Sequence, residues 1–236
     1  MTKNLLIIPF FNEEKTIKPV LNEIIKYYCD DILLIDDGST DLSRCVVEAL
    51  NRKDIMMIKH KKNQGYGKSL IDGFNYAIVN GYNLAITMDC DAQHEPSQIP
   101  AFIKNSVTAD IVSGSRYLKE YTQNLDAPED RFRINKIVTQ ALNKVLATKI
   151  TDAFCGFKAY SINSLKKLKL TEKGYALPLQ LLVQVAFLKL ELTELPVPRL
   201  YFHAERSFGK ILDDPDARLR YYLQTIEKEV KKWKSI

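Results

Sequence analysis

The sequence predicts an α/β fold in which a mostly parallel, Rossmann-like central sheet is covered by helices on both faces. Four short apolar runs, at residues 4–10, 31–37, 55–60 and 83–89, have the length and composition of buried strands. Each run is followed by a segment in which apolar residues recur at helical spacing. Strands that alternate with helices in this way form βαβ units, whose parallel strands are buried on both faces.

The remaining elements follow in order along the chain. The helices expected after the four strands cover residues 17–28, 42–50, 66–79 and 96–107. After residues 110–117 the pattern loosens into a polar segment at 118–130, which we expect to be a mobile loop. A basic helix at 131–147, a buried helix at 175–190, an extended segment at 191–202 and a last helix at 215–233 complete the chain. No repeat or linker divides it, so we expect a single domain, 1–236.

Composition excludes several classes of protein. The 46% hydrophobic content is that of a globular protein, and the net charge of +5 is mild and spread along the chain, so we expect no nucleic-acid partner. The four cysteines show no CxxC spacing and the N-terminus lacks the features of a signal peptide, which favours a reducing cytoplasm. The apolar window at 175–190 is short for a membrane span and contains polar residues, so no transmembrane segment is predicted.

Polar motifs follow each of the four predicted strands. They are PFFNEE after the first strand, DDGSTD after the second, HKKNQGYGK after the third and DCDAQH after the fourth. In open parallel sheets, ligands bind at the carboxyl ends of the strands. The sequence therefore predicts a ligand site at this edge of the sheet.

Two aspartates stand one residue apart at the end of the fourth strand. Asp89 and Asp91 would point to the same side of an extended segment and repel each other. One interpretation is a solvated turn in which Asp89 caps the next helix. The other is a site for a hard cation such as Mg²⁺ or Mn²⁺; His94 would suit a softer metal, but no second histidine stands at ligand spacing.

The motifs after the second and third strands also have two interpretations each. NQGYGKS matches neither the Walker A sequence nor the dinucleotide GxGxxG. Its glycines permit close backbone approach, with Lys68 at a helix start where anions are favoured, although a simple strand-to-helix turn would look the same. In the motif after the second strand, Ser39 or Thr40 could simply cap the next helix. Asp36 and Asp37 together exceed what a cap requires, and we expect these carboxylates to accept hydrogen bonds from a nucleobase or ribose.

The whole set of motifs resembles a known family. PFFNEE, LLIDDGSTD, NQGYGKS, MDCDAQHEP, SGSRY and DAFCGFKAY occur in the order and at the spacing of the family 2 glycosyltransferases with the GT-A fold. The similarity is greatest to the dolichol-phosphate mannose synthase group and bacterial polyprenyl-phosphate sugar transferases, and it covers about residues 5–209. It implies a nucleotide-sugar-binding half at 1–115, an acceptor-side half at 116–212 and a C-terminal helix at 213–236.

This resemblance implies an activity. The enzyme would invert the anomeric configuration while moving a sugar from a UDP- or GDP-sugar, with Mg²⁺ or Mn²⁺ stabilising the leaving diphosphate. A polyprenyl phosphate is the favoured acceptor. A soluble or glycan hydroxyl acceptor, a catalytically silent nucleotide-sugar-binding module and a nucleotidyltransferase are the alternatives.

The resemblance also assigns roles to residues. The base and ribose pocket would be lined by Pro9, Phe11, Asn12, Glu13, Asp36 and Asp37, with Lys68 and Cys90 nearby. Asp89, Asp91 and Gln93 match a metal-binding DxDxQ motif, in which Asp91 is essential to catalysis. Cationic positions that face the donor or acceptor phosphates in the family correspond to Arg116, Arg131, Arg133, Arg206 and Lys210, each of which would singly read as a solvated surface charge.

The acceptor decides whether a general base is needed. A lipid phosphate is already anionic, whereas a hydroxyl needs a carboxylate to take its proton. Asp152 is the candidate base, and orienting its loop is the alternative role. The family often has a glutamate where this chain has Gln180, which cannot act as a base. Any membrane contact would be peripheral, through the basic helix or the loop at 117–130, or would be made through a separate membrane subunit.

Overall fold

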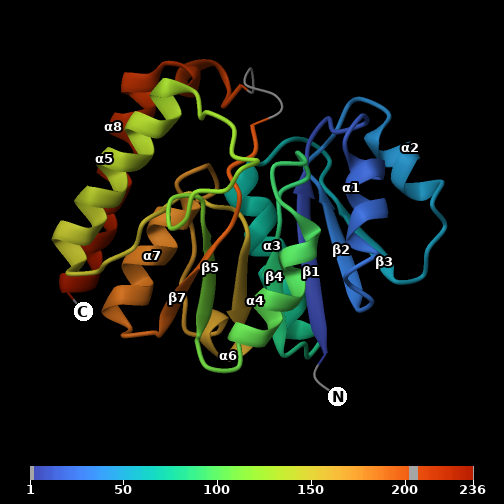
Figure 1. The fold of residues 1–236 in the computed structure, drawn as a ribbon, viewed down its shortest axis with the longest axis horizontal. Coiled ribbons are helices and arrows are strands. Elements are labelled where there is room, and N and C mark those ends of the chain that lie inside the picture. The colour runs from blue at the N-terminus through green and yellow to red at the C-terminus, as the bar shows by residue number, and fades with distance from the viewer. Residues whose placement is uncertain (1–2, 202–206, 236) are drawn as a thin grey trace.

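The computed structural model describes residues 3–201 and 207–235, and its strands form a seven-stranded sheet with helices on both faces (Figure 1). The strands are β1 (Asn4–Phe10), β2 (Asp31–Asp36), β3 (Ile55–Lys59), β4 (Leu84–Thr87), β5 (Ile111–Ser115), β6 (Lys158–Ser161) and β7 (Leu192–Pro196). The helices are α1 (Ile17–Ile24), α2 (Ser43–Glu48), α3 (Tyr66–Val79), η1 (Pro96–Gln98), α4 (Ile99–Asn105), α5 (Glu129–Leu146), α6 (Ile162–Leu165), α7 (Leu177–Phe187), η2 (Lys210–Asp213) and α8 (Pro215–Lys234).

The strand order is β3-β2-β1-β4-β6-β5-β7, and the strand pairs are parallel except those made by β6. β6 lies between β4 and β5 and runs antiparallel to both. The prediction of a mostly parallel sheet is confirmed, and the antiparallel strand is an addition to it. The carboxyl ends of β1, β2, β3 and β4 meet at one edge, as the sequence predicts.

Side chains on alternate sides of the strands enter two separate cores. On β1, Leu6 and Ile8 pack with apolar residues of α1 and α4, while Leu5 and Ile7 pack with those of α3 and α7. A third core joins α7 to α5 and α8. α7 is therefore covered on both sides, which explains why its sequence is largely apolar, with Gln180 and Gln184 as buried exceptions.

Several predicted boundaries differ from the structure. The helix expected at 96–107 begins as a 3₁₀ turn and is α-helical only over Ile99–Asn105. The segment at 118–130 has no regular structure before α5, but it is tied to the 191–202 segment, where Tyr121 donates to the Pro196 carbonyl (3.1 Å) and the Leu125 N–H donates to the Arg199 carbonyl (2.7 Å). The proposed division at residue 115 stays a prediction. Within the described residues, no helix combines the length and apolar character needed to span a membrane.

Candidate active site

The loops that follow β1 and β2 are tied together by side-chain hydrogen bonds. The Asn12 N–H donates to Ser39 Oγ (3.1 Å), and Asn12 Oδ1 accepts from the Thr40 N–H (2.8 Å). Asn12 has a φ of 56°, in the left-handed region that asparagine tolerates. The Glu13 N–H donates to Ser43 Oγ (2.7 Å). The structure therefore brings these two predicted nucleotide-binding loops together.

The other predicted nucleotide-binding residues of β1 and β2 differ in accessibility. The Phe11 side chain is 43% exposed and so presents an aromatic ring to solvent, whereas Pro9 is buried within β1. Asp36 is fully buried, and its carboxylate accepts from the Ser39 N–H and from Arg44 Nε, both at 2.8 Å. Aromatic rings stack on bases regardless of base identity, so of these three residues Phe11 is the accessible candidate for a base contact.

Asp37 organises the glycine loop, which we define as residues 63–68. One oxygen of Asp37 accepts from the Gln64 N–H (2.8 Å) and lies 2.7 Å from His60 Nδ1, while the other accepts from the N–H of residue 65 (2.9 Å). The second ring nitrogen of His60 lies 2.9 Å from Asp72, whose carboxylate also pairs with Lys68. Asp37 and Lys68, both predicted to contact the nucleotide, are thus bonded to other protein groups.

The glycine loop packs directly against the backbone of residues 172–174. A Cβ on Gly65, whose φ is +104°, would lie 2.4 Å from the carbonyl oxygen of Lys173, and one on Gly67 would lie 2.5 Å from that of Glu172. The Lys68 N–H donates to the Lys173 carbonyl (3.0 Å). Because the amides of residues 64, 65 and 68 already have protein acceptors, these three amides do not form a phosphate cradle.

The paired aspartates lie at the end of β4. Asp89 accepts from Tyr66 OH at Oδ1 (3.0 Å), and its Oδ2 lies 3.2 Å from His94 Nε2. Asp91 is buried and accepts from the Gln93 N–H (3.1 Å). His94 is therefore bonded to a carboxylate, and its buried Nδ1 has no hydrogen-bond partner among the described residues.

The two aspartates have opposite pKa shifts. Burial by itself raises the pKa of Asp89, but the hydrogen bond and charge of His94 and the hydrogen bond from Tyr66 hold it below its ordinary value. Burial and the neighbouring charge of Asp89 raise the pKa of Asp91 to about 6. After burial, the second cause of the raised pKa of Asp91 is the like-charge repulsion expected from the sequence, which a divalent cation bound to both groups would relieve.

The backbone after Asp152 packs closely against Asp89. A Cβ on Gly156 would lie 2.2 Å from Asp89 Oδ2, and the Gly156 carbonyl accepts from Thr87 Oγ1 (2.7 Å). Within residues 3–201 and 207–235, no group of three or more His, Cys, Asp or Glu side chains is arranged to hold a metal ion. Two carboxylates suit Mg²⁺ or Mn²⁺, which bind through one or two carboxylates and complete their coordination with substrate phosphates. The residues therefore fit such a cation, while Gln93 as a further ligand stays a prediction.

Arg116 and Asp152 form a buried ion pair beside the site. Arg116 Nε and Nη2 donate to the two oxygens of Asp152 (2.6 and 2.9 Å), and its backbone N–H also donates there (3.2 Å). Asn135 and the Phe154 N–H add two more donors (2.8 and 3.0 Å). Although burial opposes ionisation, Arg116 holds the pKa of Asp152 well below its ordinary value. A carboxylate with five donors and a lowered pKa is a poor proton acceptor, so the geometry favours the loop-orienting role of Asp152 over that of general base.

The predicted phosphate-binding cations lie in different surroundings. The Arg131 guanidinium lies 5.1 Å from the centre of the Phe208 ring, and the buried Arg218, which sequence reasoning missed, lies 4.3 Å from it. Arg133 is exposed and pairs with Asp216 on α8. Arg206 lies outside the described residues.

Two further predictions concern Cys90 and Gln180. The Cys90 side chain is buried in the core that contains α1 and α4, and burial raises the pKa of its thiol. Its expected part in donor binding stays a prediction. Gln180 donates to Glu229 on α8 (3.0 Å) and accepts from the Thr171 N–H (2.8 Å). A glutamate at position 180 would face the Glu229 carboxylate, which explains why glutamine suits this chain.

Fold and site together define the class of the protein. A sheet of this topology, with an acidic pair after a central strand and polar loops around it, is that of a glycosyltransferase with the GT-A fold. The family model for glycosyl transferase family 2 matches residues 5–169. The chain belongs to this family.

Individual relatives agree with this assignment. Over 223 residues the chain is 30% identical to a UDP-N-acetylglucosamine–dolichyl-phosphate N-acetylglucosaminyltransferase of Methanococcus voltae, covering 86% of this chain and 88% of the relative. It is 27% identical over 212 residues to an undecaprenyl-phosphate mannosyltransferase of Micrococcus luteus, covering 87% and 85%. A crystal structure of glucosyl-3-phosphoglycerate synthase from Mycobacterium tuberculosis with Mn²⁺ and UDP-glucose has a TM-score of 0.75 at 19% identity, covering 98% of this chain and 79% of that one. This last likeness shows the fold.

Proposed function

We propose that this glycosyltransferase moves a sugar from a UDP- or GDP-sugar to a polyprenyl phosphate, with Mg²⁺ or Mn²⁺ held by Asp89 and Asp91. The observation that favours a phosphate acceptor over a hydroxyl is the hydrogen bonding of Asp152. A hydroxyl acceptor needs a base, and the candidate base already accepts five hydrogen bonds. The oxygen of a lipid phosphate is anionic at neutral pH and attacks without one. The named substrates of the Methanococcus and Micrococcus relatives, dolichyl phosphate and undecaprenyl phosphate, are of this kind.

The residues of the site have separate tasks in this reaction. A cation held by these residues would supply positive charge to the departing nucleoside diphosphate. Asp89 and Asp91 hold that cation at the end of β4, and Phe11 stacks on the base. In this proposal Arg131 pairs with the acceptor phosphate, since arginine presents two parallel donors to phosphate oxygens. Arg116 is fixed by Asp152 and orients the loop that ends at Gly156.

The test compares two lipids that differ only in the phosphate. Purified protein is incubated with UDP-N-acetylglucosamine, UDP-glucose or GDP-mannose and Mn²⁺ or Mg²⁺, with either a polyprenyl phosphate or the matching polyprenol in detergent. We expect nucleoside diphosphate release and a lipid-linked sugar with the phosphate only, and neither product in EDTA. Transfer to the polyprenol or to a soluble sugar would favour the hydroxyl-acceptor alternative. Donor binding without turnover under every condition would favour the silent module.

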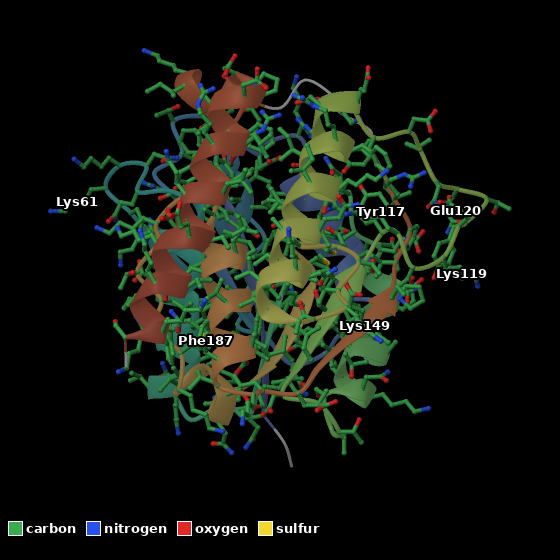
Figure 2. All side chains as sticks on the ribbon, turned by 90° about the vertical axis from the view of Figure 1, so that its left-hand side faces the viewer. Lys61, Tyr117, Lys119, Glu120, Lys149 and Phe187 are labelled. Carbon is green, nitrogen blue, oxygen red and sulfur yellow. The ribbon has the colours of Figure 1, made fainter. Side chains whose placement is uncertain are left out.

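A lipid acceptor also requires contact with a membrane, and α5 and α8 offer a surface for it. The two helices lie side by side on the face seen in Figure 2. The exposed cations of these two helices are Arg133, Lys136, Lys144, Arg220, Lys228, Lys231, Lys232 and Lys234, and their exposed acidic residues are Glu129, Asp216 and Glu227. An excess of cations favours anionic lipid headgroups. The protein should float with vesicles that contain anionic lipid and not with neutral vesicles; equal behaviour toward both would favour a separate membrane subunit.

A further inference from the structure

The glycine loop has a structural task that the proposed reaction leaves unassigned. Asp37 holds the loop from one side, and the backbone of residues 172–174 holds it from the other. Because Gly65 and Gly67 bring two backbone segments into contact, the first turn of α3 has little freedom to move. The residue between these glycines is Tyr66, whose position is therefore determined from both sides.

Tyr66 carries this rigidity to the acidic pair. Its ring stacks on Tyr175, with centroids 5.9 Å apart and planes 14° from parallel. Its hydroxyl donates to Asp89 Oδ1 (3.0 Å).

The Asp89 carboxylate is thereby held at both oxygens. Tyr66 bonds Oδ1, and His94 approaches Oδ2 at 3.2 Å from the other side. The Gly156 backbone also lies against Oδ2, since an added Cβ there would overlap this oxygen. Each oxygen has one hydrogen-bond partner among the described residues, and a carboxylate oxygen can accept two, so the carboxylate can be fixed by the protein and still bind a cation. Asp91 is held differently, through the N–H of a residue in its own turn.

From this geometry we infer that Tyr66 is a positioning residue that orients Asp89 as a metal ligand, and that the glycine loop exists to deliver its hydroxyl. The inference rests on the proposed function, because it assumes that Asp89 binds a divalent cation. Partners that orient a ligand typically change metal affinity by about 10- to 100-fold when they are removed. The glycines of NQGYGKS therefore serve Asp89 and need not contact the diphosphate at all.

The test removes one hydroxyl and leaves the ring. Tyr66→Phe keeps the stacking on Tyr175 and loses the hydrogen bond to Asp89. Tyr82→Phe is the matched control, because Tyr82 OH donates to Asp31 at 2.7 Å, in a bond between a tyrosine and an aspartate that lies outside the site. Both variants and the wild type are titrated with Mn²⁺ in the presence of UDP or GDP, with free Mn²⁺ measured by electron paramagnetic resonance. Nucleotide affinity is measured separately in EDTA, and melting curves are recorded.

We expect Tyr66→Phe to bind Mn²⁺ about tenfold more weakly than wild type, with unchanged nucleotide affinity in EDTA, and Tyr82→Phe to bind Mn²⁺ normally. In a turnover assay, Tyr66→Phe should be slower than wild type at low Mn²⁺ concentration and should recover the wild-type rate at high Mn²⁺ concentration. Normal Mn²⁺ binding by Tyr66→Phe, while Asp91→Asn loses it, would overturn the inference and leave the proposed function intact. A wild type that binds no Mn²⁺ with either nucleotide would overturn the metal site and this inference together.

Discussion

Replacing Asp152 with asparagine is expected to destabilise the folded protein and to leave the transfer reaction of the folded enzyme in place. The side chains of Arg116 and Asp152 are 13% and 0% exposed, so the substitution leaves a guanidinium buried without its counter-ion. Breaking one partner of a buried pair costs about 3–5 kcal/mol. For a chain of this length, 1 kcal/mol corresponds to about 2–4 °C in melting temperature, so a loss of about 3 kcal/mol lowers it by about 6–12 °C.

Thermal unfolding measured by circular dichroism is the assay, and an exposed pair of the same chemistry is the control. Arg133 and Asp216 are paired with side chains 51% and 68% exposed, so Asp216→Asn should change stability by at most about 1 kcal/mol. Because the pKa of Asp152 is lowered in the folded state, its stabilisation is present above the unfolded pKa of about 3.9 and is lost as the pH falls toward the folded value. The difference in melting temperature between wild type and Asp152→Asn should therefore be constant near neutral pH and shrink below about pH 4.

One result would refute this reasoning. If Asp152→Asn melts like wild type but has lost transfer to every acceptor, then Asp152 acts directly in the chemistry and the five hydrogen bonds are not its main role. Loss of stability together with retained activity at low temperature is the result that the ion pair predicts.

Three further predictions concern the acidic pair. Asp91→Asn should abolish sugar transfer and should melt at the wild-type temperature or above it, because burial and the charge of Asp89 disfavour the ionised Asp91 carboxylate in the folded state. A melting temperature several degrees lower would contradict this reasoning. The Mn²⁺ affinity of the wild type, measured by calorimetry, should fall by up to about tenfold per pH unit below about pH 6, because a proton on Asp91 competes with the metal. Equal affinity at about pH 5 and pH 7 would count against Asp91 as a metal ligand. Gly156→Ala should weaken Mn²⁺ binding, because the new Cβ would lie 2.2 Å from Asp89 Oδ2. Binding as tight as in wild type would mean that the backbone at residue 156 shifts without displacing Asp89.

Much of the fold could be predicted because its signals are local. The strands from β1 to β4 and the helices between them have apolar periodicities that mark each element without knowledge of its neighbours. The direction of β6 could not be predicted, because pairing between β4 and β5 is decided by contacts between residues far apart in the chain. The shortening of α4 reflects Pro96 and Pro100, which favour a 3₁₀ turn and then a helix start over one continuous helix.

In the candidate site, too, features with a local sequence signal could be predicted, and contacts between distant segments could not. The rule for strand ends placed Asp89 and Asp91 at the correct edge of the sheet, because it needs only the order of strands and helices. The bond from Tyr66 to Asp89 has no local signal, since these residues belong to different motifs. Likewise Glu194, which accepts from the N–H groups of Thr151 and Asp152, lies on β7 and could be connected to that loop only by the folded sheet.

The place of β6 in the sheet has a consequence for how the chain is made. On the ribosome, β4 and β5 emerge first, yet they never touch, because the strand that separates them is translated some forty residues later. Until then the open side of β4 offers unpaired amides and carbonyls, which is a hazard for association with other nascent chains. The backbone that packs against Asp89 arrives with the same late segment, so a polypeptide interrupted before residue 156 carries the acidic pair without it.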